Sequence, residues 1–256
     1  VTPKGAASYR IPLATPPGTA GVSPAVALEY DSQAGADMLG VGWKIGGLSQ
    51  ITRCGKTQAV DGVTRGVSLD AKDPFCLDGQ RLVKVSGTHG ATAEYRTEID
   101  GISRIRSTGS DVDKGPDSWI VATKDGRTLS YGTTAGSQFI APGKTAKVTW
   151  AIARSEDRYG NYASYQYVDG EGTGEFYLTR IRYTGNDAAS PALVPYISIN
   201  FLYEDRPDTW SGFVSGSLLW RLKRLTAIQV RTNTAADGSG GTFKREWKVA
   251  YSPSAT

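Results

Sequence analysis

The sequence predicts an all-β fold, mostly antiparallel, in which many hairpins form an extended or spiral sheet, a sandwich or a shell. Apolar and polar residues alternate with a period of two in segments such as 148–153 and 197–204, which is typical of half-buried strands. Asp-Gly pairs, which suit hairpin turns, separate strand-like runs at 78–79, 100–101 and 125–126. We therefore expect one β domain over residues 1–256 with under ~10% helix.

The first fifty residues predict three strands and a glycine-rich corner. The strands are expected over 8–13, over 24–30 and in a run that ends at 51–53, with a Pro-Pro-Gly turn at 16–18 between the first two. The corner at 39–43 contains Gly40, Gly42 and Trp43. Small residues beside a bulky ring allow close packing, so we expect Trp43 to be a core anchor.

A second tight turn is predicted at Gly160 and Asn161, three residues after Asp157. It is expected to set the register of the strand that carries Tyr165 and Tyr167, and glycine suits the positive φ angle that such a turn requires. The segment 210–222 has room for one helical turn, but Gly212 and Gly216 argue against a longer helix.

Composition excludes several classes of partner. The net charge is only +4, and the densest basic cluster, Arg221, Lys223, Arg224 and Arg231, fits the solvent face of a strand better than a nucleic-acid surface. No apolar run reaches the ~18 residues of a membrane span. The chain begins at Val1 without a signal peptide, so we interpret it as a piece of a longer polypeptide.

The two cysteines leave two states open. Cys54 and Cys76 stand 22 positions apart, and the chain has one histidine, His89. These residues cannot supply a four-ligand zinc site, so the cysteines form either a disulfide or two free buried thiols. A disulfide across this loop would contribute ~3 kcal/mol.

Other polar clusters are better explained without catalysis or metal. Asp111, Asp113 and Asp117 have spacing that suits Ca²⁺, but the loop lacks a bidentate Glu, so a solvated loop is favoured. Glu204, Asp205, Arg206 and Asp208 are expected to form an ion-pair network rather than a glycosidase carboxylate pair. His89 is expected in a surface turn, and 40–46 lacks the helix of a phosphate cradle.

Taken in order, several motifs resemble the N-terminal module of SpvB-type virulence proteins. This module also opens the B components of insecticidal toxin complexes and many RHS-repeat toxins. The similarity includes the opening strands and corner, D-x-F-x-L-D-G-type and W-x-V-x-x-K-D-G-type elements at 73–82 and 119–126, and the segment 201–208 with Arg206 and Asp208. Asp157 to Tyr183 also looks like a YD/RHS-type repeat unit.

The resemblance implies a structural role. In toxin-complex relatives such a module helps to build a β-shell with RHS repeats around a C-terminal toxic domain, so the partners would be the rest of the parent polypeptide and toxin-complex subunits. It implies a secreted, extracellular protein with no cofactor and no catalytic residues. The surplus of Trp and Tyr leaves an alternative, a carbohydrate- or host-surface-binding β module.

Overall fold

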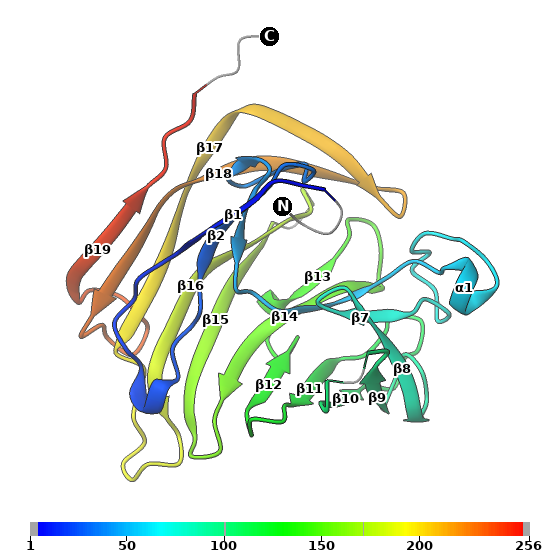
Figure 1. Cartoon of the computed structure of the whole chain (residues 1–256), viewed down its shortest axis with the longest axis horizontal. Coiled ribbons are helices and arrows are strands. Elements are labelled where there is room, and N and C mark those ends of the chain that lie inside the picture. The colour runs from blue at the N-terminus through cyan, green and yellow to red at the C-terminus, as the bar shows by residue number, and fades with distance from the viewer. Residues whose placement is uncertain (1–4, 100, 171, 253–256) are drawn as a thin grey trace.

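A 14-stranded antiparallel sheet dominates the structure, a computed structural model that describes residues 5–99, 101–170 and 172–252 (Figure 1). Strands account for 53% of the chain and helices for 4%, so the all-β prediction and the expected upper limit on helix are confirmed. The helical elements of the described residues are α1 (Gln58–Asp61) and two 3₁₀ turns, η1 (Thr19–Gly21) and η2 (Ala135–Ser137).

Eight strands of this sheet close into a barrel. In order around the barrel they are β6 (Gln50–Arg53), β7 (Phe75–Leu77), β8 (Gln80–Gly87), β9 (Ala93–Thr97), β10 (Arg104–Thr108), β11 (Ser118–Ala122), β12 (Thr128–Tyr131) and β14 (Lys147–Glu156). The ring closes at β14, where Ser155 pairs with Leu129 of β12 and Trp150 pairs with Ile51 of β6. A short strand, β13 (Gln138–Ile140), adds to β14.

Aromatic side chains fill the interior of the barrel. Trp119, Trp150 and Tyr95 are fully buried and Phe75 nearly so. Their rings meet edge to face, with centroids 5.8 Å apart for Trp119–Trp150 and 5.0 Å apart for Phe75–Trp119, the geometry that the ring quadrupole favours. The Trp150 indole donates a hydrogen bond to the Pro116 carbonyl at 2.8 Å. The barrel is therefore a packed core rather than a channel.

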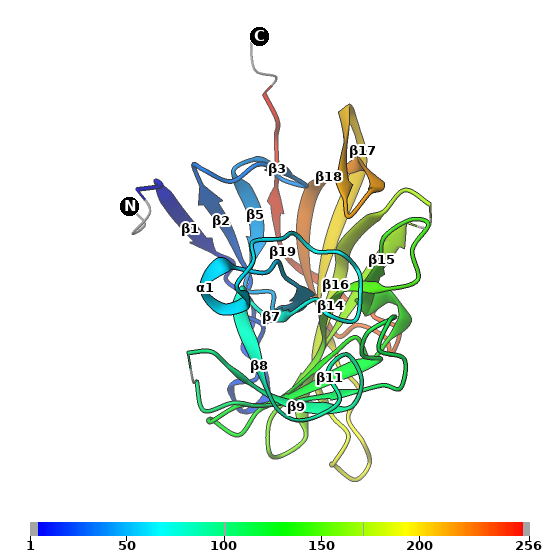
Figure 2. The same ribbon diagram turned by 90° about the vertical axis from the view of Figure 1, so that its right-hand side faces the viewer.

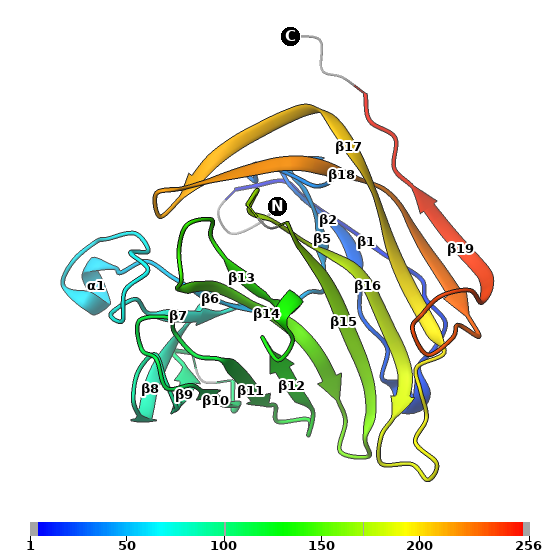
Figure 3. The ribbon, with the colours of Figure 1, turned by 180° about the vertical axis from the view of Figure 1, so that it is seen from behind.

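Beyond β14 the sheet continues as an open, curved wall (Figure 3). Its strands are β15 (Asn161–Gly170), β16 (Glu175–Asn186), β17 (Ile197–Val214), β18 (Ser217–Thr232) and β19 (Thr242–Lys248). In the described part of the chain β19 pairs with β18 alone, so it forms the free edge of the wall.

A separate N-terminal sheet packs against this wall (Figure 2). It consists of β1 (Ser8–Pro12), β2 (Ala27–Asp31) and β5 (Trp43–Gly46), and the small pair β3 (Ala36–Asp37) and β4 (Gly40–Val41) stands beside it. Leu13 and Val26 share one hydrophobic core with Ile199 and Leu225 of the wall. The Tyr183 hydroxyl donates to the Pro16 carbonyl at 2.8 Å. The two layers are therefore joined by apolar packing and by hydrogen bonds.

The third N-terminal strand predicted from the sequence is two strands. β5 ends at Gly46 and β6 begins at Gln50. Gly47 has a φ of 82°, and a Cβ built there would lie 2.0 Å from the Ala25 carbonyl oxygen. The chain therefore turns at Gly47, and β6 enters the barrel instead of extending the N-terminal sheet.

Hairpin turns occupy the expected Asp-Gly positions. Asp78 and Gly79, with φ angles of 49° and 82°, form the two-residue connection between β7 and β8, as the primed turns require. Gly126, with a φ of 81°, lies between β11 and β12. Asp100 lies outside the described residues. The segment 210–222, for which one helical turn was considered, belongs to the β17–β18 hairpin.

Candidate functional site

The end of the β17–β18 hairpin, residues 210–221, projects beyond the neighbouring strands and is called here the aromatic arm (Figure 1). On one face it exposes Phe213, Leu218 and Trp220, with exposed fractions of 75%, 39% and 38%. The opposite face carries Leu219, which is buried against Phe139 in a small second core. Clustered exposed apolar side chains of this kind mark a contact surface.

The free edge of β19 lies in the same wall as the aromatic arm. The first four residues of this strand, 242–245, are exposed. A free strand edge presents unpaired backbone donors and acceptors to a further strand. The wall therefore has both a backbone edge and an apolar surface through which it can be extended.

A groove of about 950 Å³ separates the N-terminal sheet from the middle of β17 and β18 and from the end of β19. Its lining residues come from β1, β2, β4 and β5 on one side and from segments 206–208 and 248–252 with Arg224 on the other. This groove brings together two parts of the sequence that were considered separately, the corner with Trp43 and the segment with Arg206 and Asp208.

Arg206 is a buried cation at this groove. Its side chain is 4% exposed, and Nε and Nη2 donate to the Asp208 carboxylate at 3.1 and 3.0 Å. The Arg206 guanidinium is the main cause that holds the pKa of Asp208 below its usual range. Nη1 of Arg206 is buried and has no hydrogen-bond partner among the described residues. Such a donor carries a desolvation cost until an acceptor reaches it.

The ion-pair network predicted around Arg206 is confirmed. Besides the Arg206–Asp208 pair, Glu204 accepts from Arg224 at 2.7 Å and Asp205 from Lys223 at 2.5 Å. Each carboxylate of the segment is therefore paired with a cation, as expected for a structural network.

The corner residues differ in how tightly they are constrained. Gly42 has a φ of 79°, and a Cβ there would lie 2.5 Å from Cε2 of Tyr30; Gly40 has a φ of 91° and more space. Trp43 is half-buried and packs 5.3 Å from the Tyr30 ring at the margin of the core. The expectation that Trp43 is a core anchor needs correction, because the fully buried indoles are Trp119 and Trp150.

The turn at Asp157 is closed by its own side chain. The Asp157 carboxylate accepts from the backbone N–H and the side-chain amide of Asn161, each at 2.9 Å. Burial raises the pKa of Asp157, but these hydrogen bonds outweigh it, so the pKa lies below its ordinary value. Gly160 has the expected left-handed φ of 81°. The Asp157 carboxylate therefore stabilises the turn between β14 and β15. Its hydrogen bonds are made within the fold and have a structural role.

The two tyrosines of β15 pack in the core rather than form a ligand-binding surface. Tyr165 is buried, and burial raises its pKa to about 12. Tyr167 stacks on Phe176 with centroids 5.2 Å apart, and its hydroxyl donates to the Ile152 carbonyl at 3.0 Å. Both rings therefore contribute to the core between β14, β15 and β16.

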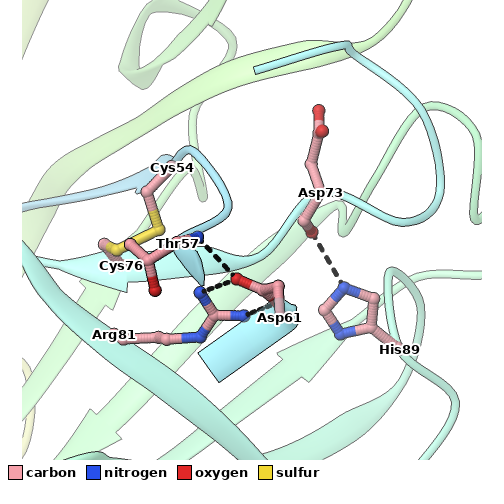
Figure 4. The surroundings of a disulfide bond; sticks show 7 residues. All are labelled: Cys54, Thr57, Asp61, Asp73, Cys76, Arg81 and His89. Atoms are coloured by element: carbon pink, nitrogen blue, oxygen red, sulfur yellow. Dashed lines mark hydrogen bonds and ion pairs between the residues drawn. A yellow bond between two sulfur atoms is a disulfide. The ribbon is translucent and has the colours of Figure 1, made fainter. Parts of the chain in front are cut away.

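Cys54 and Cys76 form a disulfide that joins the chain after β6 to β7 (Figure 4). Nearby, the Arg81 guanidinium donates to both carboxylate oxygens of Asp61, at 2.6 and 2.9 Å. The hydrogen bond from Arg81 is the main cause that lowers the pKa of Asp61. The disulfide and this ion pair together fix the loop that contains α1.

His89 lies in the predicted turn between β8 and β9, but its ring is half-buried rather than on the surface. Its Nε2 lies 2.9 Å from the Asp73 carbonyl oxygen and its Nδ1 lies 3.2 Å from the Tyr95 hydroxyl (Figure 4 shows the former contact). The ring also packs on Phe75, with centroids 4.9 Å apart. Burial lowers the pKa of His89 from its ordinary value. The ring is therefore part of the barrel packing.

The carboxylates of the 107–118 loop contact lysines and backbone. Asp111 pairs with Lys114 at 3.2 Å, and Asp117 pairs with Lys147 at 3.2 Å. In the described residues no three His, Cys, Asp or Glu side chains are arranged to hold a metal ion. None of the helices in the described ranges is long and apolar enough to cross a membrane.

Sequence reasoning missed a buried ion pair between Arg53 and Asp73, which lie on segments far from any recognised charge cluster. The only sequence signal for it is a charged residue at the end of each of two strand-like runs, 48–53 and 73–77. Pairing between β6 and β7 brings the two ends together.

Comparison with known proteins identifies the family. A family model described as "SpvB: Salmonella virulence plasmid 65kDa B protein" matches residues 1–187. The chain therefore belongs to the SpvB family, and the resemblance stated from its motifs is confirmed. A comparison with curated protein sequences found no match.

Solved structures share the fold at low sequence identity. The N-terminal domain of effector protein SpvB from Salmonella typhimurium strain LT2 aligns with a TM-score of 0.74 at 19% identity, covering 92% of this chain and 91% of that one. The TcdB2-TccC3 structure gives 0.74 at 20% identity, covering 96% and 14%. The Photorhabdus luminescens Tc holotoxin pore gives 0.76 at 19%, covering 98% and 14%. The chain thus spans about a seventh of the toxin-complex chains.

Proposed function

We propose that residues 1–256 are one non-catalytic structural module of a secreted toxin-complex-like polypeptide, which helps to form a β-shell that encloses and delivers a C-terminal toxic domain. The observation that carries this proposal is the asymmetry of the sheet. One end closes into a barrel, whereas the other ends in the free edge of β19 within the described chain. A wall with one sealed end and one free edge is suited to extension by further strands.

The aromatic arm supports the same role. Phe213, Leu218 and Trp220 expose apolar surface on one face of the hairpin, and such surface is stabilised when another part of an assembly covers it. We infer that the partners are the remainder of the parent polypeptide, with RHS repeats and a toxic domain, and other toxin-complex subunits. The solved structures in which this fold takes up 14% of a chain agree with such a context.

The proposed lack of catalysis rests on how the polar groups are used. A hydrolase or transferase needs a base and a nucleophile that face a common open site. Both ring nitrogens of His89 have partners, and the carboxylates of 204–208 are held in ion pairs. These groups stabilise the fold and leave no activated nucleophile beside them.

Co-expression with the downstream segment of the parent gene tests the proposal. We expect the wild-type chain to co-purify with that segment and a Phe213→Ser/Trp220→Ser variant to do so at least about tenfold more weakly. Tyr9→Ser is the matched control, because Tyr9 is 64% exposed on β1 of the N-terminal sheet. Absence of co-purification, together with tight binding to a glycan array, would replace the structural role with the carbohydrate-binding alternative.

A further inference from the structure

The face of the wall that is turned away from the N-terminal sheet carries three arginines. Arg182 of β16 pairs with Ser198 of β17, and Ser198 pairs with Arg231 of β18, so the three residues share one face. Arg180 stands two residues before Arg182 on the same face of β16. Neighbouring strands lie about 4.8 Å apart, so the Cα atoms of Arg182 and Arg231 are roughly 10 Å apart. Side chains as long as arginine can converge over that distance.

Every oxygen that accepts a hydrogen bond from Arg180, Arg182 or Arg231 is neutral. These oxygens belong to the Asn200 side chain and to the backbone carbonyls of Asp237, Pro195 and Gly240, at 2.7, 2.7, 3.1 and 3.4 Å. Across the described ranges 5–99, 101–170 and 172–252, none of the three guanidiniums forms an ion pair with a carboxylate. The three positive charges are therefore not neutralised by direct contacts.

The carboxylates on or beside this face do not balance these charges. Several have cations of their own: Asp187 and Glu156 pair with Arg154, and Glu246 pairs with Lys248. Asp237 remains, and it is exposed, with its Oδ1 accepting from the Ser239 backbone N–H at 2.8 Å. Three cations against one carboxylate leave two positive charges in excess.

The connection between β18 and β19, residues 233–241, folds over the arginines (Figure 3). A Cβ at Gly238 would lie 2.9 Å from Nη1 of Arg180 and 3.0 Å from Cδ of Arg182. Arg182 is only 9% exposed, and burial lowers its pKa from the ordinary value. A nearby anion would favour the charged form of this guanidinium and offset the cost of burying it.

The other two arginines keep donors that reach solvent. Arg180 and Arg231 are half-buried. Nη2 of each makes no hydrogen bond within the described residues, and neither atom is among the buried side-chain donors that lack a partner. The cluster therefore combines a covered cation, Arg182, with two accessible guanidinium groups.

These features fit one class of anion best. The planar fork of a guanidinium matches the oxygens of a phosphate group, to which it can donate two hydrogen bonds. A phosphate monoester carries nearly two negative charges above its second pKa of about 6, which equals the excess charge of the cluster. A carboxylate or a sulfate ester brings one negative charge and would leave the other uncompensated.

We propose that Arg180 and Arg231 bind a phosphate monoester as its dianion, with the positive charge of Arg182 behind them. The accessible Nη2 atoms of Arg180 and Arg231 donate to the phosphate oxygens. Arg182 acts through its charge, because its side chain is covered. The site includes neither the aromatic arm nor the free edge of β19, so it does not depend on the proposed shell role.

Two small esters of the same shape test the chemistry. Methyl phosphate and methyl sulfate differ by one negative charge at about pH 8. We expect the 256-residue chain to bind methyl phosphate at least about tenfold more tightly, measured by isothermal titration. Equal affinity for the two esters overturns the assignment of a dianion. Binding of inorganic phosphate without binding of methyl phosphate identifies the free ion as the ligand and overturns the assignment of an ester.

A matched pair of variants tests the location. Arg231→Gln should weaken binding of methyl phosphate at least about tenfold, and Arg231→Lys, which keeps the charge but not the fork, should weaken it less. Arg106→Gln is the control, because it removes the same charge from β10 of the barrel, where Arg106 is 54% exposed. Arg180→Gln repeats the test if Arg231→Gln lowers the melting temperature. Equal binding by the glutamine variants of the cluster and by the control overturns the site.

Two further measurements complete the test. Methyl phosphate should raise the melting temperature of the wild type and of Arg106→Gln, but not that of Arg231→Gln, because only a ligand bound to the folded state stabilises it. Arg231→Gln should also co-purify with the downstream segment as well as the wild type does. Loss of that association, without competition by methyl phosphate, would identify a group of the partner segment as the occupant and overturn the proposal.

Discussion

Arg53 and Asp73 form an ion pair in the interior of the barrel, with Nη1 and Oδ2 3.5 Å apart and each side chain 1% exposed. Arg53 also donates to the carbonyls of Asp70 and Lys147, at 2.6 and 2.7 Å. Asp73 accepts from the backbone N–H of Leu69 at 2.6 Å. The pair therefore joins β6, the start of β14 and the long loop before β7.

Removing one charge of this pair should strongly destabilise the fold. Asp73→Asn leaves the Arg53 guanidinium buried without a counter-charge, and we expect the free energy of unfolding to fall by ~3–5 kcal/mol in urea titrations. Asp125→Asn is the matched control, because the Asp125–Arg127 pair is solvent-exposed and such pairs contribute little. Equal effects of the two changes would show that Arg53 is solvated in solution.

The Cys54–Cys76 disulfide should stabilise the chain mainly by restricting its unfolded state. It closes a loop with a sequence separation of 22, so a Cys54→Ala/Cys76→Ala variant should lose ~3 kcal/mol of unfolding free energy. The measurement is denaturant unfolding of the variant and of the wild type, each with and without reductant. Reductant should affect only the wild type, and a free-thiol assay that finds two thiols in the untreated wild type would contradict the disulfide.

Gly160 should tolerate a side chain less well than another glycine with the same backbone angle. A Cβ at Gly160 would lie 2.7 Å from Cβ of Ala188, whereas one at Gly172 would meet nothing within 4 Å; their φ angles are 81° and 82°. The left-handed angle alone costs ~1–2 kcal/mol for a residue with a Cβ. Gly160→Val should therefore lose clearly more stability than Gly172→Val in thermal unfolding. Similar losses would mean that the segment around Ala188 moves freely.

The two tryptophans Trp43 and Trp150 should differ in their effect on stability. Trp150 is fully buried and Trp43 is half-buried, so Trp150→Ala should cost ~3–5 kcal/mol of unfolding free energy and Trp43→Ala distinctly less. Denaturant unfolding of both variants gives the comparison. A larger loss for Trp43→Ala would restore its interpretation as the core anchor.

His89 should make stability depend on pH near neutrality. Burial lowers its pKa below the ordinary 6.5, so the unfolded state binds the proton more readily than the folded state. Stability should consequently decrease as the pH falls from about 6.5 to the folded-state pKa and should lose this dependence in His89→Gln. His89 is the chain's single histidine, so proton NMR follows its pKa without overlap. A folded-state pKa at or above 6.5 would contradict the burial.

Alternation in the sequence predicted the strands well but did not reveal where alternation is broken. In β16 the register shifts, since Gln166 pairs with Arg180 and Tyr167 with Leu178, which leaves Thr179 as an extra residue. Leu178 and Ile181 are consequently both buried, although they stand on opposite faces in a regular strand. A bulge of this kind depends on the partner strand, so a local pattern cannot predict it.

Local sequence patterns also could not predict the contacts between segments that are distant along the chain. The sequence indicated hairpins, but it did not indicate that β14 pairs with β6 and β12 to close a barrel. Contacts with Asp73, Phe75 and Tyr95 half-bury the ring of His89, which the flanking glycines alone placed in a surface turn. The burial of Trp43 was overestimated. Its glycine neighbours indicated close packing, but they did not indicate that one side of the ring lines the groove.

The position of the N-terminal sheet has a consequence for the order of folding during synthesis. Pro16 contacts Tyr183 across 167 residues, and Met38 contacts Tyr251 across 213. Within residues 1–256, the strands that are synthesised first are therefore among the last to receive their covering layer. Because long-range pairing is slow and leaves apolar surface exposed meanwhile, β1, β2 and β5 are the part of the nascent chain most in need of a chaperone.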